Sequence, residues 1–445
     1  MKTYTFNPAN ITLNDNYDII VVGGGPAGSA AAIASARRGA KTLLIEATGA
    51  LGGMATSGLV PSWCPFWDKE KIIYKGIAEE IFLESRAQLD NYNENMYDWV
   101  PIDPEGLKLI YDRKVTESGA DVLFNTCLTY VDQEQGEVQA IIVSNKAGLT
   151  AYKAKVYIDC TGDADLCFFA GATVLPKDDE SGYQPATLCF SLSNVDEQAY
   201  KNEQYLHPNN PNSPIYKIVE SGNYDIPDTH VCLSRIYNGT YGFNAGHIWD
   251  VENGDPACVS NALIRGRKLA HEIHRALKDY QPKAFGGSKM ANTAAVIGIR
   301  ESRRILGDYV LTIDDYMDRK TFTDEICRNC YYIDIHNSKA EIDDFFEGKL
   351  EAPERTRRYG KGESHGIPYR CLTPKGLKNV LVAGRSISTD RTVQASTRVM
   401  PVCLCMGEAA GKAAVIAKES KQIDVHSIDV SKLRQWIIED NGYIK

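Results

Sequence analysis

Three glycines and one carboxylate carry the clearest chemistry in this chain. Gly23, Gly25 and Gly28 have the spacing G-x-G-x-x-G, and Glu46 follows at the end of the next apolar run. In such a turn the first glycine permits a tight bend, the second lets the backbone approach a pyrophosphate, and the third lets a helix pack closely on a sheet. A carboxylate such as Glu46 can accept hydrogen bonds from both hydroxyls of an adenosine ribose, and it would repel the 2′-phosphate of NADP. These residues predict a dinucleotide site that NAD or FAD could occupy.

The elements that must position these residues can be read around them. Residues 18–46 consist of an apolar run, the glycine turn, an alanine-rich stretch that begins at Pro26, and a second apolar run that ends at Glu46-Ala47. This order predicts a strand, a turn, a helix and a strand. The N-terminus of the helix would present free N–H groups and a partial positive charge to the phosphates.

Two further segments favour FAD over NAD. Residues 49–58 form a second loop of small residues, which would allow close backbone approach to the pyrophosphate and the ribityl chain. Near the other end, the apolar run 379–385 meets a glycine turn, and 401–417 predicts a helix of small residues. The N-terminus of that helix could face the N1/O2 edge of a flavin, where negative charge develops on reduction. No second G-x-G-x-x-G follows a strand, so we expect one dinucleotide, held by segments from both ends of the chain.

The remaining chain predicts an α/β protein with an insertion. A helix is expected over 104–119, and three strands of a β-meander over 121–131, 137–145 and 150–159. Residues 175–290 are rich in Asn, Tyr, Asp and Pro, with a helix near 258–279; strand-like runs follow over 291–313, and helices and loops outside the sheet over 314–354. We therefore predict a Rossmann-like FAD-binding domain, a parallel sheet plus a β-meander, in two parts (1–174 and 355–445). An inserted mixed α+β substrate domain (175–313) and an excursion (314–354) would separate them.

Composition narrows the classes of function. The 445 residues carry a net charge of −9, with a pI near 5.5, which argues against a nucleic-acid partner. The N-terminal residues lack an apolar signal core, and no run approaches the ~20 apolar residues of a membrane span. The twelve cysteines are scattered, so we expect reduced thiols, a cytoplasmic location and no membrane partner. No sequence feature marks an oligomeric interface.

Several segments together resemble a known family. The chain is similar to the FAD-dependent oxidoreductases of the glutathione-reductase structural class, and more narrowly to a bacterial subfamily of which some members are labelled xanthan lyase. The matching segments keep their order over nearly the whole chain: VVGGGPAGSAAAIASARRG, LIEATGALGGMATSGLV, IDCTGDADL, NAGHIWDV, GIRESRRILGDYVLT, IPYRCLTPKGLKNVLVAGRSIS and ASTRVMPVCLCMGEAAGKAA.

The resemblance implies a set of cofactor-binding positions. They are expected at the pyrophosphate, the adenosine, the ribityl chain and the flavin, with Leu128 giving backbone contacts to the adenine. The full set is Gly23, Gly25, Pro26, Ala27, Gly28, Glu46, Ala47, Gly52, Gly53, Met54, Ala55, Thr56, Leu128, Thr161, Gly162, Asp163, Gly384, Arg385, Met400, Pro401, Val402 and Cys403. Arg385 departs from the wider class, in which many members have an acid at that point to bond the ribityl chain.

Two residues are candidates for the chemistry itself. Arg300 could hold a substrate carboxylate or stabilise reduced flavin, or it could belong to a structural ion network at a domain joint. His247 could take a proton from a substrate hydroxyl or amine, or it could be satisfied by loop backbone. His336 and His365 are expected to be structural or at a pocket rim.

The cysteines and the metal-ligand spacing point to no second site. Cys64 is expected to be a small buried residue rather than a flavin-facing thiol. The pair Cys327 and Cys330 lacks a second pair at zinc-ligand spacing, so no metal site is predicted.

The expected function is hydride transfer between flavin N5 and a small organic substrate in a pocket between two domains. Two alternatives stay open: a polysaccharide lyase or other carbohydrate-processing protein, and a non-enzymatic flavin-binding protein.

Overall fold

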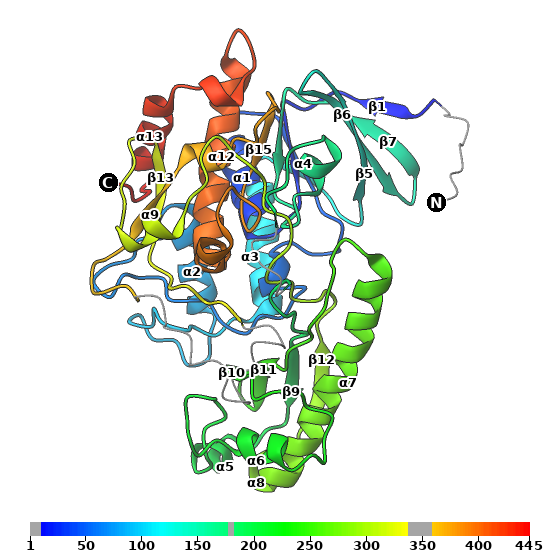
Figure 1. Ribbon diagram of the computed structural model, residues 1–445, viewed down its shortest axis with the longest axis vertical. Coiled ribbons are helices and arrows are strands. Elements are labelled where there is room, and N and C mark those ends of the chain that lie inside the picture. The colour runs from blue at the N-terminus through cyan, green and yellow to red at the C-terminus, as the bar shows by residue number, and fades with distance from the viewer. Residues whose placement is uncertain (1–9, 177–181, 337–357) are drawn as a thin grey trace.

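A parallel five-stranded sheet forms the centre of the molecule. The computed structural model describes residues 10–176, 182–336 and 358–445 (Figure 1). The strand order is β15-β8-β2-β3-β4, with bounds Val380–Val382, Val156–Asp159, Ile19–Val22, Thr42–Ile45 and Asp121–Leu123. Most of these short apolar strands are fully buried, as expected where both faces of a parallel sheet are covered. The predicted α/β fold class and the strand–turn–helix–strand unit over 18–46 are confirmed.

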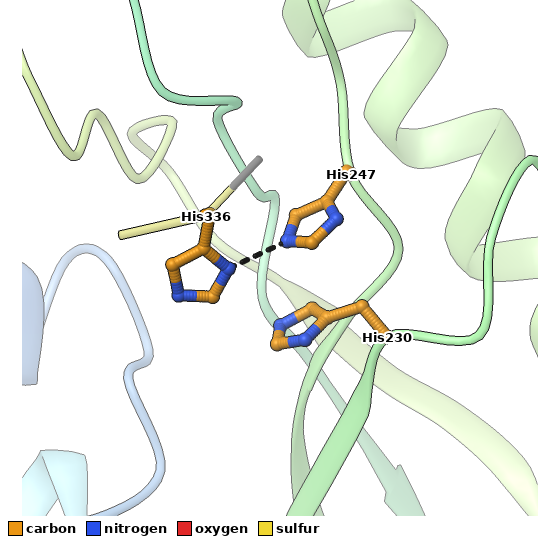
Figure 2. A group of neighbouring side chains, drawn as sticks. All are labelled: His230, His247 and His336. Atoms are coloured by element: carbon orange, nitrogen blue, oxygen red, sulfur yellow. Dashed lines mark hydrogen bonds between the residues drawn. The ribbon is translucent and has the colours of Figure 1, made fainter. Parts of the chain in front are cut away.

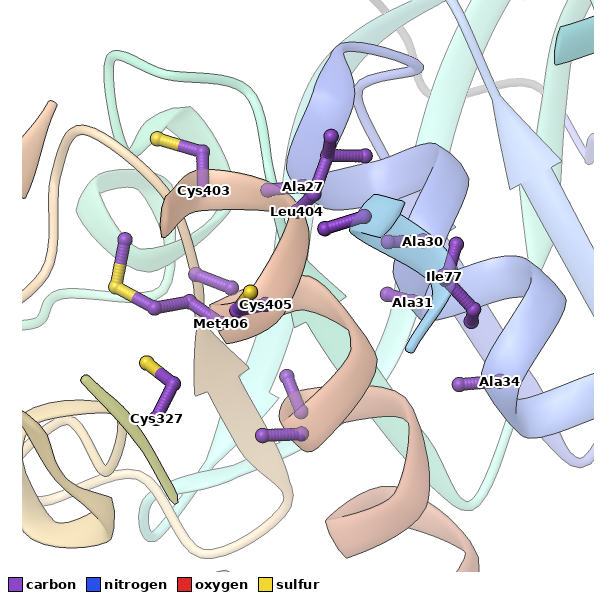
Figure 3. Close-up of a cluster of buried hydrophobic side chains, with 14 of the residues drawn as sticks. Ala27, Ala30, Ala31, Ala34, Ile77, Cys327, Cys403, Leu404, Cys405 and Met406 are labelled. Carbon is purple, nitrogen blue, oxygen red and sulfur yellow. The ribbon is translucent and has the colours of Figure 1, made fainter. Parts of the chain in front are cut away.

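Two helices from opposite ends of the chain pack closely on this sheet. Helix α1 spans Pro26–Arg37 and helix α12 spans Met400–Glu419. Alanines of α1 face α12 in Figure 3, and a Cβ at Gly411 of α12 would lie 2.4 Å from the carbonyl oxygen of Ala31. Small residues are therefore required on both helices. Helices α2 (Ile77–Ala87), α3 (Pro104–Glu117) and α13 (Val430–Glu439) complete this layer.

Helix α12 also corrects one expectation. Within the described ranges it is the one helix whose length and hydropathy would suffice to cross a membrane, although the sequence reading found no run of that kind. All of its most apolar window is buried inside the protein. Its apolar character is therefore accounted for by its place in the core.

The β-meander exists, but two of its predicted strands are divided between sheets. Region 121–131 splits into β4 of the central sheet and β5 (Cys127–Glu134), because the chain turns at Asn125, which has a φ of 49°. Region 150–159 splits into β7 (Gly148–Tyr152) and the central strand β8. The meander sheet has the order β1-β7-β6-β5, where β1 is Thr12–Asn14 and β6 is Glu137–Asn145.

A second sheet, of order β10-β11-β9-β12, forms the lower part of Figure 1. Its strands are Val231–Tyr237, Thr240–Ala245, Phe190–Ser193 and Lys289–Thr293, and helix α7 (Pro256–Tyr280) lies along it. The sheet and α7 share a hydrophobic cluster of their own. The short helices α5 (Glu197–Lys201), α6 (Pro214–Glu220) and α8 (Pro282–Phe285) lie at its lower end in Figure 1. The predicted domain boundaries stay a prediction.

The strand-like runs expected over 291–313 are mostly not strands. Strand β12 ends at Thr293, and the segment beyond it makes only isolated bridges, such as Thr187 with Gly298. In this segment the side chains of Arg300 and Arg304 donate hydrogen bonds to the backbone carbonyl oxygens of Pro185 and Thr389, so these carbonyls are satisfied without a regular strand pairing.

The excursion 314–354 was expected to hold helices and loops. It contains α9 (Ile313–Met317) but also β13 (Glu325–Asn329), which pairs with β14 (His365–Pro368) in a separate two-stranded sheet. Residues 337–354 lie outside the described part of the chain. The remaining short elements are η1 (Gly53–Ala55), α4 (Asp165–Phe169), η2 (Tyr369–Cys371), α11 (Arg391–Thr397) and η3 (Val425–Ser427).

Candidate functional site

A cavity of about 1370 Å³ opens where the parallel strands β2, β8 and β15 end. Ligands of open α/β sheets bind outside the carboxyl ends of the strands, where the strand order reverses; here β3 and β8 lie on opposite sides of β2. Drug-sized ligands occupy sites of roughly 300–1,000 Å³. The cavity therefore has room for a dinucleotide and a second molecule beside it.

At two positions of the glycine turn after β2 the surrounding backbone leaves no room for a side chain. Gly23 has a φ of +95°, and a Cβ there would lie 2.4 Å from the carbonyl oxygen of Cys160. A Cβ at Gly28 would lie 1.7 Å from the carbonyl oxygen of Gly23, so only glycine lets α1 approach the turn. A Cβ at Gly25 would meet no atom within 4 Å, so this glycine borders open space. That open space is what close approach of a pyrophosphate to the backbone requires.

Glu46 lies at the end of β3 beside the turn. Its carboxylate accepts hydrogen bonds from Gly24 N at 2.6 Å and from Thr48 N at 2.7 Å. These bonds fix the carboxylate on the wall of the cavity, on the side expected for the adenosine ribose.

Two helix N-termini that no side chain caps border the same cavity. Helix α1 starts after Gly25 and helix α12 after Val399, and neither has a side-chain cap or an acidic residue in its first turn. Free N–H groups and the positive end of the helix dipole favour negative charge at such places. FAD carries a pyrophosphate and gains negative charge at N1/O2 on reduction, so the pair of helix ends fits this cofactor.

The ends of β8 and β15 are joined across the cavity wall by an ion pair. Arg385 donates to Asp163 Oδ1 at 2.6 Å and to the carbonyl oxygen of Ile299 at 3.0 Å. Arg385 is the position where many members of the wider class have an acid. In this chain the nearby acid comes from Asp163, which the neighbouring strand supplies.

The structure brings most of the predicted cofactor positions together at this cavity. The lining includes Gly23, Gly25, Pro26, Ala27, Glu46, Gly53, Met54, Thr161, Gly162, Asp163, Gly384, Arg385, Met400 and Cys403. The lining does not include Gly28, Ala47, Gly52, Ala55, Thr56, Leu128, Pro401 and Val402. Leu128 lies on β5 and packs against a separate hydrophobic cluster, so its contact with adenine stays a prediction.

Arg300 lines the same cavity. It donates to the carbonyl oxygen of Pro185 at 2.7 Å and to Thr187 Oγ1 at 2.9 Å, and its side chain is almost fully buried. Burial lowers the pKa of Arg300 to about 10, so the guanidinium remains charged at neutral pH. Its hydrogen bonds give it a structural role and also fix a positive charge at the cavity.

His247 is also at the cavity, and carboxylate and imidazole neighbours flank it. Its Nδ1 lies 2.9 Å from Asp228 Oδ2, and its Nε2 lies 2.9 Å from His336 Nδ1. Burial lowers the pKa of His247, the carboxylate of Asp228 raises it, and the charge of Arg300 lowers it further. The net shift is downward, so His247 is neutral at neutral pH and can accept a proton. His336 lines the cavity, while His365 is a buried residue of β14.

The cysteines at and near the cavity are not activated. Burial raises the pKa of Cys64 and of Cys403 to about 12, so neither is a thiolate at neutral pH. All twelve cysteines are free, including Cys327 and Cys330.

Three residues at the cavity end were missed by the sequence reading. Asp228 and His230 precede β10, and Asp334 lies after β13; all three line the cavity. The spacing of these residues along the chain gave no signal, because two different sheets bring them together.

Comparison with known families gives one match over nearly the whole chain. The family described as "FAD dependent oxidoreductase" matches residues 18–437. The predicted cofactor, FAD, agrees with this family.

Individual relatives match shorter stretches. The digeranylgeranylglycerophospholipid reductase of Methanocaldococcus jannaschii is 62% identical over 200 residues, which are 41% of this chain and 47% of that protein. A dihydrolipoyl dehydrogenase of Trypanosoma brucei brucei is 53% identical over 47 residues, 10% of each chain. The matched stretches thus span less than half the length of these relatives.

Among solved structures, a geranylgeranyl bacteriochlorophyll reductase-like protein from Thermoplasma acidophilum has a similar fold. The TM-score is 0.50 at 15% identity, over 97% of this chain and 84% of the other. At that identity the likeness concerns the fold alone.

Proposed function

This chain belongs to the FAD-dependent oxidoreductase family and is an FAD-dependent enzyme, and from that premise we propose that it oxidises or reduces a small, polar organic substrate. The substrate would occupy the part of the cavity beyond the cofactor, between the central sheet and the second sheet. When bound, FAD supplies a position, N5, that accepts or donates a hydride. The observation that carries the proposal is the single cavity that joins the glycine turn to His247 and Arg300.

The residues beyond the cofactor suit a substrate that must release or take up a proton. Neutral His247 could accept a proton at Nε2 once a substrate takes the place of its contact with His336, while Asp228, 2.9 Å from Nδ1, would stabilise the imidazolium that forms. Arg300 would attract an anionic group of the substrate, since its guanidinium stays charged. Its bonds to Pro185 and Thr187 would keep that charge in one place.

We place the chain, as a finer proposal, in the glutathione-reductase class and in the subfamily sometimes labelled xanthan lyase. The β-meander that interrupts the central sheet and the C-terminal helix that returns to the glycine turn support this placement. Polysaccharide cleavage without redox change is less well supported than hydride transfer, because the charged groups converge on a cavity that also holds the cofactor positions. A cytoplasmic location and the lack of nucleic-acid or membrane partners stay predictions from composition.

The names of the relatives suggest a second candidate, reduction of an isoprenoid lipid chain. The cavity lining offers something to both candidates. Asp228, three histidines, Arg300 and Asp334 favour a polar substrate, whereas Val219, Val259 and Leu263 of the same lining would suit an apolar chain.

The test is anaerobic reduction of the FAD-loaded protein by candidate substrates. Small hydroxy acids, alcohols and amines would be added one at a time while the visible absorbance of the flavin is followed. We expect at least one polar class to bleach the flavin, and the variant His247→Gln to bleach more slowly with flavin content unchanged. Bleaching by apolar polyprenyl compounds alone would favour the second candidate. A sugar polymer cleaved with no change in the flavin spectrum would favour the lyase.

A further inference from the structure

Three histidines of the cavity lining lie close together. His230 precedes β10, His247 follows β11, and His336 follows β13 (Figure 2). One ring nitrogen of each lies within 4.8 Å of one ring nitrogen of both others. The rings of His230 and His247 are stacked at 4.2 Å, and the ring of His336 stands edge-on to both. Separate segments thus bring three imidazole rings into one small region of the cavity wall.

A carboxylate lies next to one ring nitrogen of His247 and another next to one ring nitrogen of His336. Asp228 Oδ2 lies 2.9 Å from His247 Nδ1, and Asp334 Oδ2 lies 3.6 Å from His336 Nε2. The two remaining nitrogens, His247 Nε2 and His336 Nδ1, face each other at 2.9 Å. Histidines that bind metals almost always direct their second nitrogen to a carboxylate, a carbonyl or a water, which fixes the tautomer and the ring orientation. The arrangement around His247 has this form, and around His336 the carboxylate of Asp334 lies near the second nitrogen, just beyond hydrogen-bond distance.

Metal binding requires the neutral form of each imidazole, and the charges around the cluster bear on whether a cation can be held there. A neutral imidazole has one lone pair free for a cation. Arg300 and Arg398 would oppose a cation here, while Asp228 and Asp334 would favour it, so the charges around the cluster are balanced.

We propose that His230, His247 and His336 bind one divalent transition-metal ion whose open coordination position faces the substrate end of the cavity. Imidazole ligands suit Zn²⁺, Fe²⁺, Ni²⁺ and Cu²⁺. Three protein ligands with an open position are typical of catalytic rather than structural zinc sites. Because Zn–N bonds are ~2.0–2.1 Å, two nitrogens of a tetrahedral site lie roughly 3.3 Å apart. His247 Nε2 and His336 Nδ1 must therefore separate slightly on binding, and the His230 nitrogen must take up a similar distance from both.

The open position would take an oxygen of the substrate, a hydroxyl or a carboxylate. This part rests on the proposed function, because it assumes that a substrate enters the cavity. With the ion bound, His247 Nε2 is a ligand and no longer a proton acceptor. The ion would then lower the pKa of a substrate hydroxyl bound to it, and deprotonation would no longer depend on the imidazole of His247.

The experiment is a metal titration of the FAD-loaded full chain, without substrate. Protein treated with a chelator and dialysed would be titrated with Zn²⁺ by calorimetry, and bound metal would be counted by elemental analysis. We expect about one Zn²⁺ per chain. The variant Asp228→Asn should bind Zn²⁺ about 10–100-fold more weakly, because an outer carboxylate is lost. His247→Gln and His336→Gln should lose the site.

Two controls make the test decisive. His271→Ala changes an exposed histidine on α7, outside the cluster, and should bind Zn²⁺ like the parent. Flavin absorbance and the thermal midpoint of each variant show whether it is folded and loaded. Equal Zn²⁺ binding by the parent and by folded His247→Gln and His336→Gln would overturn the site. Because no turnover is measured, this result is independent of the proposed function. If the protein binds Zn²⁺ but no substrate bleaches its flavin, the metal site stands and the proposed function is wrong.

Discussion

A Cβ added at Gly25 would lie in open space, whereas one added at Gly28 would clash with backbone. Alanine substitutions at the two positions should therefore distinguish an effect on cofactor binding from an effect on folding. Gly25→Ala places its Cβ in open space, and Ala is a weaker N-cap for α1 than Gly, so the free energy of unfolding without FAD should fall by no more than about 1 kcal/mol. The methyl group would stand where the pyrophosphate approaches, so FAD affinity should fall about tenfold or more, the equivalent of ~1.4 kcal/mol. Fluorescence titration of the apoprotein with FAD measures this affinity.

Gly28→Ala provides the contrast. Its Cβ would lie 1.7 Å from the carbonyl oxygen of Gly23, so the protein itself should lose stability, by about 1–3 kcal/mol or more. Equal thermal midpoints for the two apoprotein variants would contradict the assignment.

Arg300 offers a second prediction at the residue scale. Arg300→Met would leave the carbonyl of Pro185 and the hydroxyl of Thr187 without their buried donor, at a cost of about 1–3 kcal/mol. Denaturant unfolding measures this cost. The matched control is Arg303→Met, which breaks a more exposed ion pair with Asp165 and a bond to the carbonyl oxygen of Asp163, and should cost less than Arg300→Met. If both variants are equally stable, Arg300 is not a structural anchor of the cavity wall.

At the scale of elements, a buried ion pair ties α12 to its neighbours. Lys412 Nζ lies 2.6 Å from Glu408 Oε1 and 2.9 Å from Asp440, and Glu408 Oε2 accepts from Ile77 N at the start of α2. Burial raises the pKa of Glu408, which shows how costly its charge would be without Lys412. Lys412→Met should therefore destabilise the protein by about 3–5 kcal/mol.

The comparison variant for this pair is Glu408→Gln. It keeps an acceptor for Ile77 N and leaves Lys412 paired with Asp440, so its loss should be clearly smaller. Chemical unfolding of both variants measures the difference. A Glu408→Gln loss as large as that of Lys412→Met would show that the uncompensated charge is not the cause.

The sequence predicts elements well where one local rule decides them. The helices over 104–119, 258–279 and 401–417 have a proline at the start and continuous helix-forming stretches, and each is present. The single strand expected over 121–131 is wrong, because its apolar pattern continues across the turn at Asn125. In the structure the two halves pair with different sheets, β4 with β3 and β5 with β6.

The candidate site shows the same limit. The glycine turn is local and could be recognised directly, whereas His230 and Asp334 reach the cavity only through the tertiary arrangement of two other sheets. Tertiary contacts of this kind leave no spacing pattern in the chain.

For the whole molecule, different histidines should make opposite contributions to the change of folding stability with pH. Burial lowers the pKa of His365 and of His274, so these residues charge more readily when unfolded and reduce stability as pH falls below about 6.5. His426 behaves in the opposite way. Burial would lower its pKa, but bonds to Asp308 and to the carbonyl of Leu377 outweigh burial and raise it.

The contribution of His426 can be isolated with His426→Asn. Because the folded pKa is raised, the stabilisation by His426 is fully present below its unfolded pKa of about 6.5 and is lost as pH rises through the folded pKa. The difference in thermal midpoint between parent and variant should therefore be largest near pH ~5.5 and shrink toward pH ~8.5. A difference that is constant or grows with pH would show that the imidazolium is not what matters.

The packing of α1 against α12 has a consequence for the synthesis of the protein. The face of α1 that carries Ala31 and Ala34 is synthesised long before its partner, which begins only at Met400. At ~5–20 residues per second, the ribosome needs on the order of tens of seconds to make the chain between them. During that interval the nascent N-terminal half has a central sheet without its β15 edge and an uncovered helix face. Chaperone binding to ribosome-bound chains should therefore end only after α12 has emerged from the exit tunnel.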